Sequence, residues 1–349
     1  MRVLVLDDWW KLVVAERPDP VPVGQQVLLE IHATGICGSD IHGFTGTTGR
    51  RQVGQVMGHE TVGRVLALGD GVGPEYGLEV GAVATVNPVM SCGTCAQCRA
   101  GAEQACPNRS VIGVDPAVSS AFADKMLAPA ANVIPLPDTM PIDYGALIEP
   151  LSVGYHAVHR GQIGPDERVL VIGGGPVGQA VVLAARREGA AQVVVSEPSA
   201  SRRKLNETLG AVALDLTSAE ETTGEETSAV TEALGGPPSV VVDAVGTSAS
   251  LDSALMAAAP GTTIVLVGMG EADLRLRAYE VSTQERSIVG SFCYSWEEFR
   301  ATAQWVGTAP DELGQLIEGR VDLAGGADAF TGLARGDNTA SKILVLPQA

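Results

Sequence analysis

Four cysteines stand close together in the first half of the chain, at Cys92, Cys95, Cys98 and Cys106. Their thiolates could all reach one tetrahedral ion at a Zn–S distance of about 2.3 Å. Because protein would fill every position, this ion would be structural, and the lobe around it should fold only with metal. An iron–sulfur cluster and a pair of disulfides are the alternatives. Disulfides are disfavoured because they belong mainly to small secreted domains, and this chain is large and expected to be intracellular. We therefore expect structural zinc here.

A second group of residues combines different metal-binding side chains. Cys37 supplies a thiolate, His59 an imidazole, and Glu60 and Glu149 supply carboxylates. Three protein ligands and one open position are typical of catalytic zinc. We favour Cys37, His59 and Glu149 as direct ligands, with Glu60 either coordinating or holding partners of the ligands. Exchange between the two carboxylates stays open.

The segment after Cys37 also supplies groups for proton transfer. A bound Zn²⁺ would lower the pKa of a substrate hydroxyl, so that an alkoxide forms and its carbon can release hydride. Ser39 could take the proton and pass it, through the cofactor ribose, to His42. Asp40 would orient His59 through the second ring nitrogen. The other histidines are assigned structural roles: His32, His156 and His159.

Three glycines in the second half have the spacing of a dinucleotide-binding turn, after an apolar segment and before a helical one. Gly173 would allow the sharp turn, Gly175 would let the backbone approach a pyrophosphate, and Gly178 would let helix and strand pack closely. A plain helix-start loop is the alternative. The surrounding strand and helix favour the nucleotide interpretation.

An acidic residue, Glu197, ends the next apolar segment, about 20 residues further on, as dinucleotide-binding folds require. Its carboxylate could accept hydrogen bonds from the adenosine ribose and would repel a 2′-phosphate, which favours NAD over NADP. Arg202 and Arg203 weaken this preference, because a guanidinium could bind that phosphate.

Two different patterns of apolar residues along the chain indicate two domains. Short apolar segments separated by Gly and Pro make up the first ~150 residues, which is typical of β structure. From about Ser152, apolar strands alternate with helical stretches, as in a parallel sheet. The expected strands are 1–6, 26–31, 62–68, 80–86, 168–173, 192–196, 239–244, 262–268 and 342–346, with a helix at 176–187. The polar segment 218–238 is expected to cross outside the sheet.

Composition excludes several kinds of partner. The chain of 349 residues has a formal net charge of −18, which would repel nucleic acid and anionic lipid. Its longest apolar runs are far shorter than the ~20 residues that span a bilayer, and Asp7 and Asp8 interrupt any signal-peptide pattern. We expect a cytoplasmic protein that acts on a small molecule.

The segment Gly58-His59-Glu60-Thr-Val-Gly63-Arg-Val65, the cysteine lobe and the glycine turn together resemble the zinc-containing medium-chain alcohol and polyol dehydrogenases, across essentially the whole chain. Glu149, in Glu149-Pro150-Leu151, stands where simple ethanol-oxidising enzymes have Cys, so the chain is more similar to the sorbitol, butanediol and threonine dehydrogenase branch. The resemblance implies α/β plus β architecture: a GroES-like catalytic domain (1–152 and 291–349) and an inserted Rossmann domain with a doubly wound parallel sheet (153–290).

The resemblance also implies two zinc ions per chain, a homodimer or homotetramer, and a set of cofactor contacts. These contacts are Val177, Glu197, Arg202, Val245, Gly246, Val267, Gly268, Met269, Phe292 and Tyr294. Two positions depart from the branch: Gly43 follows His42 where polyol enzymes often carry an aromatic residue, and Cys293 stands where sorbitol dehydrogenases tend to place Arg. Cys293 itself is expected to be buried and inert.

The implied function is hydride transfer between NAD(P) and a secondary alcohol, such as a polyol, vicinal diol, cyclitol or amino alcohol. A ketone reductase in a biosynthetic pathway is the nearest alternative. A non-catalytic dinucleotide-binding protein should first have lost the metal ligands, and a zinc-free quinone or enoyl reductase would not need them. Cys37, His59, Glu60 and Glu149 are all present.

Overall fold

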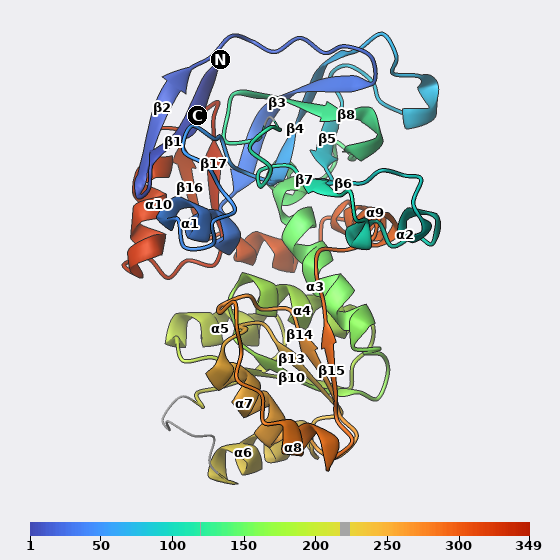
Figure 1. Cartoon of the computed structure of the whole chain (residues 1–349), viewed down its shortest axis with the longest axis vertical. Coiled ribbons are helices and arrows are strands. Elements are labelled where there is room, and N and C mark those ends of the chain that lie inside the picture. The colour runs from blue at the N-terminus through green and yellow to red at the C-terminus, as the bar shows by residue number, and fades with distance from the viewer. Residues whose placement is uncertain (119, 217–223) are drawn as a thin grey trace. The chain divides into compact units, whose positions relative to one another are not determined.

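The computed structural model describes residues 1–118, 120–216 and 224–349, and these form two compact units (Figure 1). The first unit comprises Met1–Glu149 and Ser295–Ala349, and the second comprises Pro150–Tyr294. Helix α3 (Ile148–Arg160) begins in the first unit and continues into the second. No helix in the described ranges has the length and apolar character needed to cross a bilayer.

The first unit is built on a mostly antiparallel sheet of order β16-β17-β3-β4-β5-β9, with β8 paired to β3. Its C-terminal strand β17 pairs with β3, so the end of the chain joins the N-terminal fold. The strands, with the β1–β2 hairpin and the short β6–β7 pair, are β1 Arg2–Asp8, β2 Lys11–Glu16, β3 Gln26–Gly35, β4 Glu60–Leu68, β5 Val83–Val86, β6 Val89–Met90, β7 Ser110–Val111, β8 Lys125–Pro129, β9 Val133–Pro135, β16 Gly319–Asp322 and β17 Ile343–Leu346.

Short helices connect these strands. They are α1 Gly38–Thr45, η1 Pro74–Tyr76, α2 Ala96–Arg99, η2 Glu103–Ala105, η3 Ala130–Asn132, η4 Ile142–Leu147, α9 Trp296–Val306, η5 Asp311–Leu316 and α10 Gly326–Arg335. One core lies between α1, α10 and the β1–β2 hairpin, where Phe44, Phe122 and Phe330 are fully buried. The strand expected at 80–86 begins only at Val83, because Val80 is exposed and Gly81 turns the chain with a φ of 93°.

The second unit is a six-stranded, fully parallel sheet of order β12-β11-β10-β13-β14-β15, flanked by helices (Figure 1). This confirms the expected doubly wound sheet. Its strands are β10 Arg168–Ile172, β11 Gln192–Ser196, β12 Val212–Leu214, β13 Val240–Asp243, β14 Thr263–Leu266 and β15 Ser287–Gly290. Its helices are α4 Pro176–Arg187, α5 Ala200–Thr208, α6 Gly224–Leu234, α7 Ser248–Ala257 and α8 Ala278–Ser282.

The polar segment 218–238 is more ordered than a simple crossing. Residues 218–223 lie outside the described residues, and the helix α6 follows them. Val230 and Leu234, one helical turn apart, are buried in the core beside Leu170 and Val194 of the sheet. The polar composition concealed this apolar spacing.

Candidate metal and nucleotide sites

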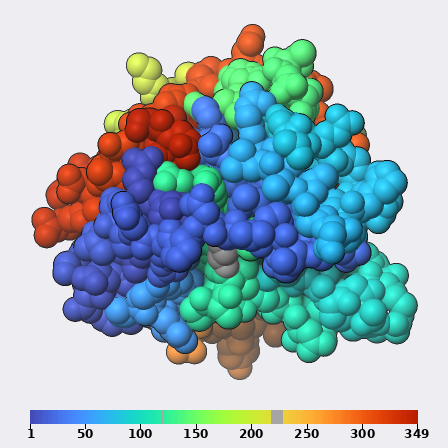
Figure 2. Space-filling model, turned by 90° about the horizontal axis from the view of Figure 1, so that it is seen from above, coloured from blue at the N-terminus to red at the C-terminus, as the bar shows by residue number. Residues whose placement is uncertain are grey.

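The structure brings the four cysteines of the lobe together in the first unit. The sulfur–sulfur distances are 3.4 Å for Cys95–Cys98, 3.6 Å for Cys92–Cys106 and 3.9 Å for Cys92–Cys98. Four sulfurs at about 2.3 Å from one tetrahedral ion would be separated by about 3.8 Å, whereas a disulfide requires about 2.05 Å. The sulfurs therefore fit one metal ion. In Figure 2 this segment, coloured teal, protrudes at the edge of the molecule.

Backbone amides of the lobe favour thiolate at one of its cysteines. Hydrogen bonds from the amides of Thr94 and Cys95 lower the pKa of Cys92 to about 5. The Cys98 amide acts the same way on Cys95, but burial and the neighbouring thiols outweigh it and raise the pKa of Cys95 to about 11. Crowded thiols that cannot all ionise without a cation are the donor set that a Zn²⁺ ion satisfies.

The second candidate group comprises Cys37, His59 and Glu60, whose ligand atoms all lie within 4.8 Å of one another. Cys37 caps the N-terminus of α1, while His59 and Glu60 stand at the start of β4. Glu149 is buried in the first turn of α3 and lies outside this 4.8 Å group. Three buried or half-buried donors of mixed type fit a zinc ion with an open position, and here the carboxylate that accompanies Cys37 and His59 is Glu60.

A buried ion pair that the sequence did not indicate holds Glu60. Lys342 donates from Nζ to Glu60 Oε1 at 2.7 Å and Oε2 at 2.5 Å, and to the carbonyl of Ile36 at 3.3 Å. Burial alone would lower the pKa of Lys342, but the negative charge of Glu60, followed by Cys37 and Glu149, raises it above its usual value. Gly35 leaves the necessary space, since a Cβ there would lie 2.1 Å from Glu60 Oε2.

Asp40 links α1 to the metal group. Its Oδ1 lies 3.5 Å from His59 Nδ1, close to the orientation expected from the sequence, and 3.4 Å from Arg51 Nη2. Burial would raise the pKa of Asp40, but His59 and Arg51 outweigh it and lower that pKa. Arg51 was not anticipated, and it explains Gly43. A Cβ at position 43 would lie 2.5 Å from Arg51 Cγ, so the aliphatic part of the Arg51 side chain occupies the room that a larger side chain would need.

The two residues expected to move protons lie on the same helix. Ser39 is in the first turn of α1 and half-buried, and His42 is exposed in its last turn. His42 Nδ1 lies 3.4 Å from the hydroxyl of Thr47. His42 is therefore open to solvent, as a terminal proton acceptor must be.

The glycine turn of the second unit has the geometry that each glycine was assigned. Gly173 has a φ of 92°, and a Cβ on Gly178 would lie 1.9 Å from the carbonyl oxygen of Gly173. The nearest atom to a Cβ on Gly175 would be Arg202 Nη1, at 3.8 Å, so its backbone stays open. Gly175 is also the residue that precedes α4, whose N-terminus favours an anion. The loop fits a pyrophosphate.

Glu197 is buried beside this turn. Its Oε2 accepts a hydrogen bond from the Gly174 amide at 2.8 Å, and its Oε1 accepts one from the Ser199 amide at 2.8 Å. Asn206, unnoticed in the sequence, donates to the Gly174 carbonyl at 2.9 Å. The acidic side chain is thus fixed against the glycine turn from two sides.

The remaining expected cofactor residues follow the ends of neighbouring parallel strands, at one edge of the sheet. Gly173 follows β10, Val245 and Gly246 follow β13, and Val267, Gly268 and Met269 follow β14. Phe292, after β15, is partly exposed, whereas Tyr294 is fully buried. Ligands of open parallel sheets bind at this edge. Cys293 is half-buried with a φ of 50°, so the expectation that it is buried was wrong: the turn after β15 holds it near the surface.

Comparison with known proteins agrees with both units. Residues 24–138 match the alcohol dehydrogenase GroES-like domain, and residues 176–308 match the zinc-binding dehydrogenase domain. The L-galactonate-5-dehydrogenase of Escherichia coli K12 is 30% identical over 95% of this chain and 94% of its own. The chain belongs to the zinc-containing medium-chain alcohol and polyol dehydrogenase family.

Two further members of this family give the same result. The sorbitol dehydrogenase of sheep (Ovis aries) is 35% identical over 80% of this chain and 78% of its own. A solved structure from Sinorhizobium meliloti 1021, described as a zinc-binding dehydrogenase bound to NADP, is 28% identical, covers 99% of both chains and has a TM-score of 0.86. The family resemblance inferred from the sequence is confirmed, and with it an enzyme of the alcohol dehydrogenase class.

Proposed function

We propose that this enzyme transfers hydride between NAD(P) and a secondary alcohol of a polyhydroxylated or amino-substituted substrate, and that it holds one catalytic and one structural zinc ion. The observation that carries the proposal is the cluster of Cys37, His59 and Glu60 within 4.8 Å, in a chain that keeps the family's nucleotide-binding sheet. A member that had lost catalysis would have no reason to retain this donor set beside a buried Lys342.

The catalytic residues would act from α1 and β4. Cys37, His59 and Glu60 would hold the zinc ion, and Glu149 is the carboxylate available for exchange with Glu60. When bound, the ion would supply Lewis acidity that lowers the pKa of a coordinated hydroxyl. Asp40 would fix the orientation of His59 through Nδ1, which lies 3.5 Å away.

Ser39 and His42 would carry the proton away from the substrate. Ser39, half-buried in the first turn of α1, would accept the substrate proton, and exposed His42 would release it to solvent. An imidazole suits this last step because its pKa lies near neutral pH. The zinc lobe would have a structural role, since its four sulfurs leave no open position.

The nucleotide would bind the second unit at the carboxyl edge of its sheet. Gly173, Gly175 and Gly178 would surround the pyrophosphate, and Glu197 would accept hydrogen bonds from the adenosine ribose. We propose NAD as the preferred cofactor because the buried Glu197 carboxylate would repel a 2′-phosphate. Both nucleotides must be tested, because the relative from Sinorhizobium was solved with NADP bound.

The names of the relatives support a substrate chain or ring with several hydroxyl groups. The Escherichia coli and sheep relatives are named for L-galactonate and sorbitol. Gly43 and Arg51 occupy the region where polyol enzymes often carry an aromatic residue, so we propose a related polyol or amino alcohol rather than sorbitol itself. Zinc content and turnover with NAD and NADP on a panel of diols, polyols, cyclitols and amino alcohols test this.

The decisive variant is Cys37→Ser. It should abolish turnover on the best alcohol and remove one of two zinc ions, whereas the matched control Cys293→Ser should keep both ions. Unchanged turnover in Cys37→Ser would overturn the zinc mechanism. Turnover at least tenfold better with NADP than with NAD would overturn the assignment of Glu197.

We further propose that the enzyme is a homodimer or homotetramer in the cytoplasm. Strand β15 ends the parallel sheet, and an edge strand offers unpaired backbone groups for a second copy. A reducing compartment suits the six cysteines, none of which is in a disulfide. Sedimentation of the purified enzyme would test the assembly.

A further inference from the structure

Two consecutive tryptophans form the turn of the β1–β2 hairpin, outside both candidate sites. Trp9 is 40% exposed and Trp10 is 48% exposed. Trp10 has a φ of 63°, a left-handed conformation that is rare for a bulky residue. The backbone N–H of Trp10 donates to the carbonyl of Phe44 at 2.8 Å, which holds this conformation in place. A two-residue hairpin turn commonly needs a positive φ, so the turn explains this backbone, whereas the exposure of two adjacent indoles calls for a functional explanation.

Both indoles pack one side against α1 and its C-terminal turn. A Cβ on Gly46 would lie 2.8, 3.0 and 3.3 Å from Cδ2, Cε3 and Cε2 of Trp9, three atoms of one ring, so Trp9 rests on that glycine. The Trp10 ring centroid lies 5.7 Å from that of Phe44, tilted by 56°. The outer surface of each indole is left to solvent or to a ligand.

The same helix connects these indoles with the metal group. Helix α1 is capped by Cys37 and ends at Thr45, beside Gly46. Eight helical residues span about 12 Å, so a ligand that touches both ends must be longer than a small alditol. His42 lies in the last turn of α1 and Thr47 just beyond it, with His42 Nδ1 3.4 Å from the Thr47 hydroxyl. A substrate whose carbinol reacts at the metal and that extends about 12 Å along α1 would bring a distal substituent to this turn.

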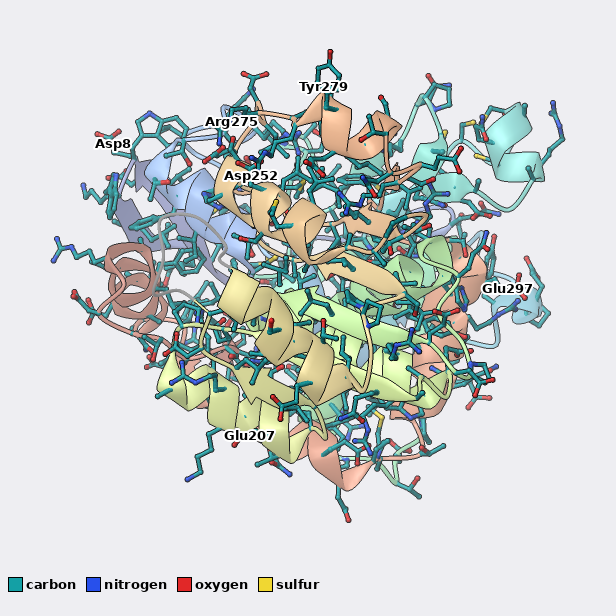
Figure 3. All side chains as sticks on the ribbon, turned by 90° about the horizontal axis from the view of Figure 1, so that it is seen from below. Asp8, Glu207, Asp252, Arg275, Tyr279 and Glu297 are labelled. Carbon is teal, nitrogen blue, oxygen red and sulfur yellow. The ribbon has the colours of Figure 1, made fainter. Side chains whose placement is uncertain are left out.

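The charge around the indoles selects the kind of substituent. Asp7 and Asp8 precede them, and Lys11 pairs with Asp7 at 2.5 Å. Asp8 accepts the Trp9 amide at 2.8 Å and otherwise extends outward at the periphery of the molecule (Figure 3). An indole face is the best aromatic partner for an organic cation, and Asp7, Asp8 and Lys11 together leave one net negative charge beside the indoles.

We propose that Trp9, Trp10 and Asp8 bind a protonated amino group on the part of the substrate distant from the reacting hydroxyl. The substrate class is then an amino-substituted saccharide or a glycosylated aminocyclitol rather than a simple sugar alcohol. This inference rests on the proposed function, because the distal position is defined by the metal group at Cys37.

Two saccharides of the same shape test the charge requirement: the glucosamine dimer and its N,N′-diacetylated form. Titration of the zinc-loaded enzyme, followed by indole fluorescence, should show the free amine binding at least fivefold more tightly, with the difference reduced by salt. Trp9→Ala and Trp10→Ala should each weaken free-amine binding about two- to fivefold, the range of an exposed cation–π contact. Asp8→Asn should weaken it about twofold, in line with an exposed charge pair.

Two controls separate this role from a structural one. Phe at either tryptophan position keeps a ring and should restore part of the affinity. Tyr279→Ala, which removes an aromatic residue of the second unit that is 85% exposed, should change nothing. Equal binding of amine and acetamide, or unchanged binding in Trp9→Ala and Trp10→Ala, would overturn the proposal. So would a change of sedimentation coefficient in those variants, because a second copy would then cover the turn. Cys37→Ser should lose turnover and keep the amine-dependent quenching, so the two proposals can fail separately.

Discussion

Replacing Lys342 with Met should strongly destabilise the metal-free first unit. The change keeps most of the aliphatic stem but leaves the Glu60 carboxylate without its cation. Opposite charges 2.5 Å apart attract by about 7 kcal/mol at an effective dielectric of about 20, and the cost of desolvating both groups offsets several kcal/mol of that. Loss of one partner from a buried pair then costs about 3–5 kcal/mol.

The chain offers a direct assay, because all four of its tryptophans lie in the first unit: Trp9, Trp10, Trp296 and Trp305. Urea unfolding followed by indole emission therefore reports on that unit. With chelator present, Lys342→Met should lose about 3–5 kcal/mol of unfolding free energy. With zinc the loss should be smaller, because the ion compensates Glu60.

The double variant Lys342→Met with Glu60→Gln provides the control. It removes both charges, so it should recover at least half of the stability that Lys342→Met loses. The reasoning is refuted if metal-free Lys342→Met unfolds within about 0.5 kcal/mol of the wild type, the range of an ordinary surface substitution. It is equally refuted if the double variant is no more stable than Lys342→Met.

Three other perturbations have clear expected outcomes. Gly35→Ala should displace Glu60, whose Oε2 lies 2.1 Å from the new Cβ, and should lower the zinc content of the purified enzyme. Gly38→Ala, with open space around it, should keep the zinc content of the wild type. Equal zinc content in the two variants would contradict this reasoning. Glu197→Ser should raise the NADP-to-NAD ratio of kcat/KM at least tenfold, and an unchanged ratio would count against a ribose contact. Hydrogen bonds from His32 and then from Arg320 lower the pKa of Asp143 in the folded enzyme. Its pKa in the unfolded chain is about 3.9, so the ionised side chain stabilises the fold above that pH and less below it. Asp143→Asn should therefore destabilise the enzyme at pH 6 and progressively less as the pH falls below 4, which urea unfolding at each pH would show.

The features that could be predicted from the sequence depend on residues that lie close together in the chain. The four thiols of the lobe lie within 15 residues, and Gly173, Gly175 and Gly178 lie within six, so local chain geometry alone brings each set together. The parallel sheet also followed from the pattern of apolar residues. In each of these cases the signal is local, because the residues concerned share one turn or one strand.

The partners of the metal group could not be found in this way. Lys342 is 282 residues from Glu60, and only the pairing of β17 with β3, in which Leu344 is opposite Gly35, brings them together. A lysine just before an apolar strand gives no sign of its partner in the sequence. The same holds for Arg51, whose burial depends on the missing side chain at Gly43.

These two buried cations determine the charge of the candidate zinc site. Arg51 balances Asp40, and Lys342 balances Glu60, so a thiolate ligand at Cys37 would add one negative charge beyond these two pairs. A divalent ion held by that set would leave one net positive charge, which would favour the anionic form of a hydroxyl bound there. Glu149, close enough to act on Lys342 electrostatically, would cancel this charge if it also coordinated. We therefore propose that Glu60 holds the ion and Glu149 stays withdrawn when a hydroxyl ionises, while Lys342 keeps Glu60 in place through both carboxylate oxygens.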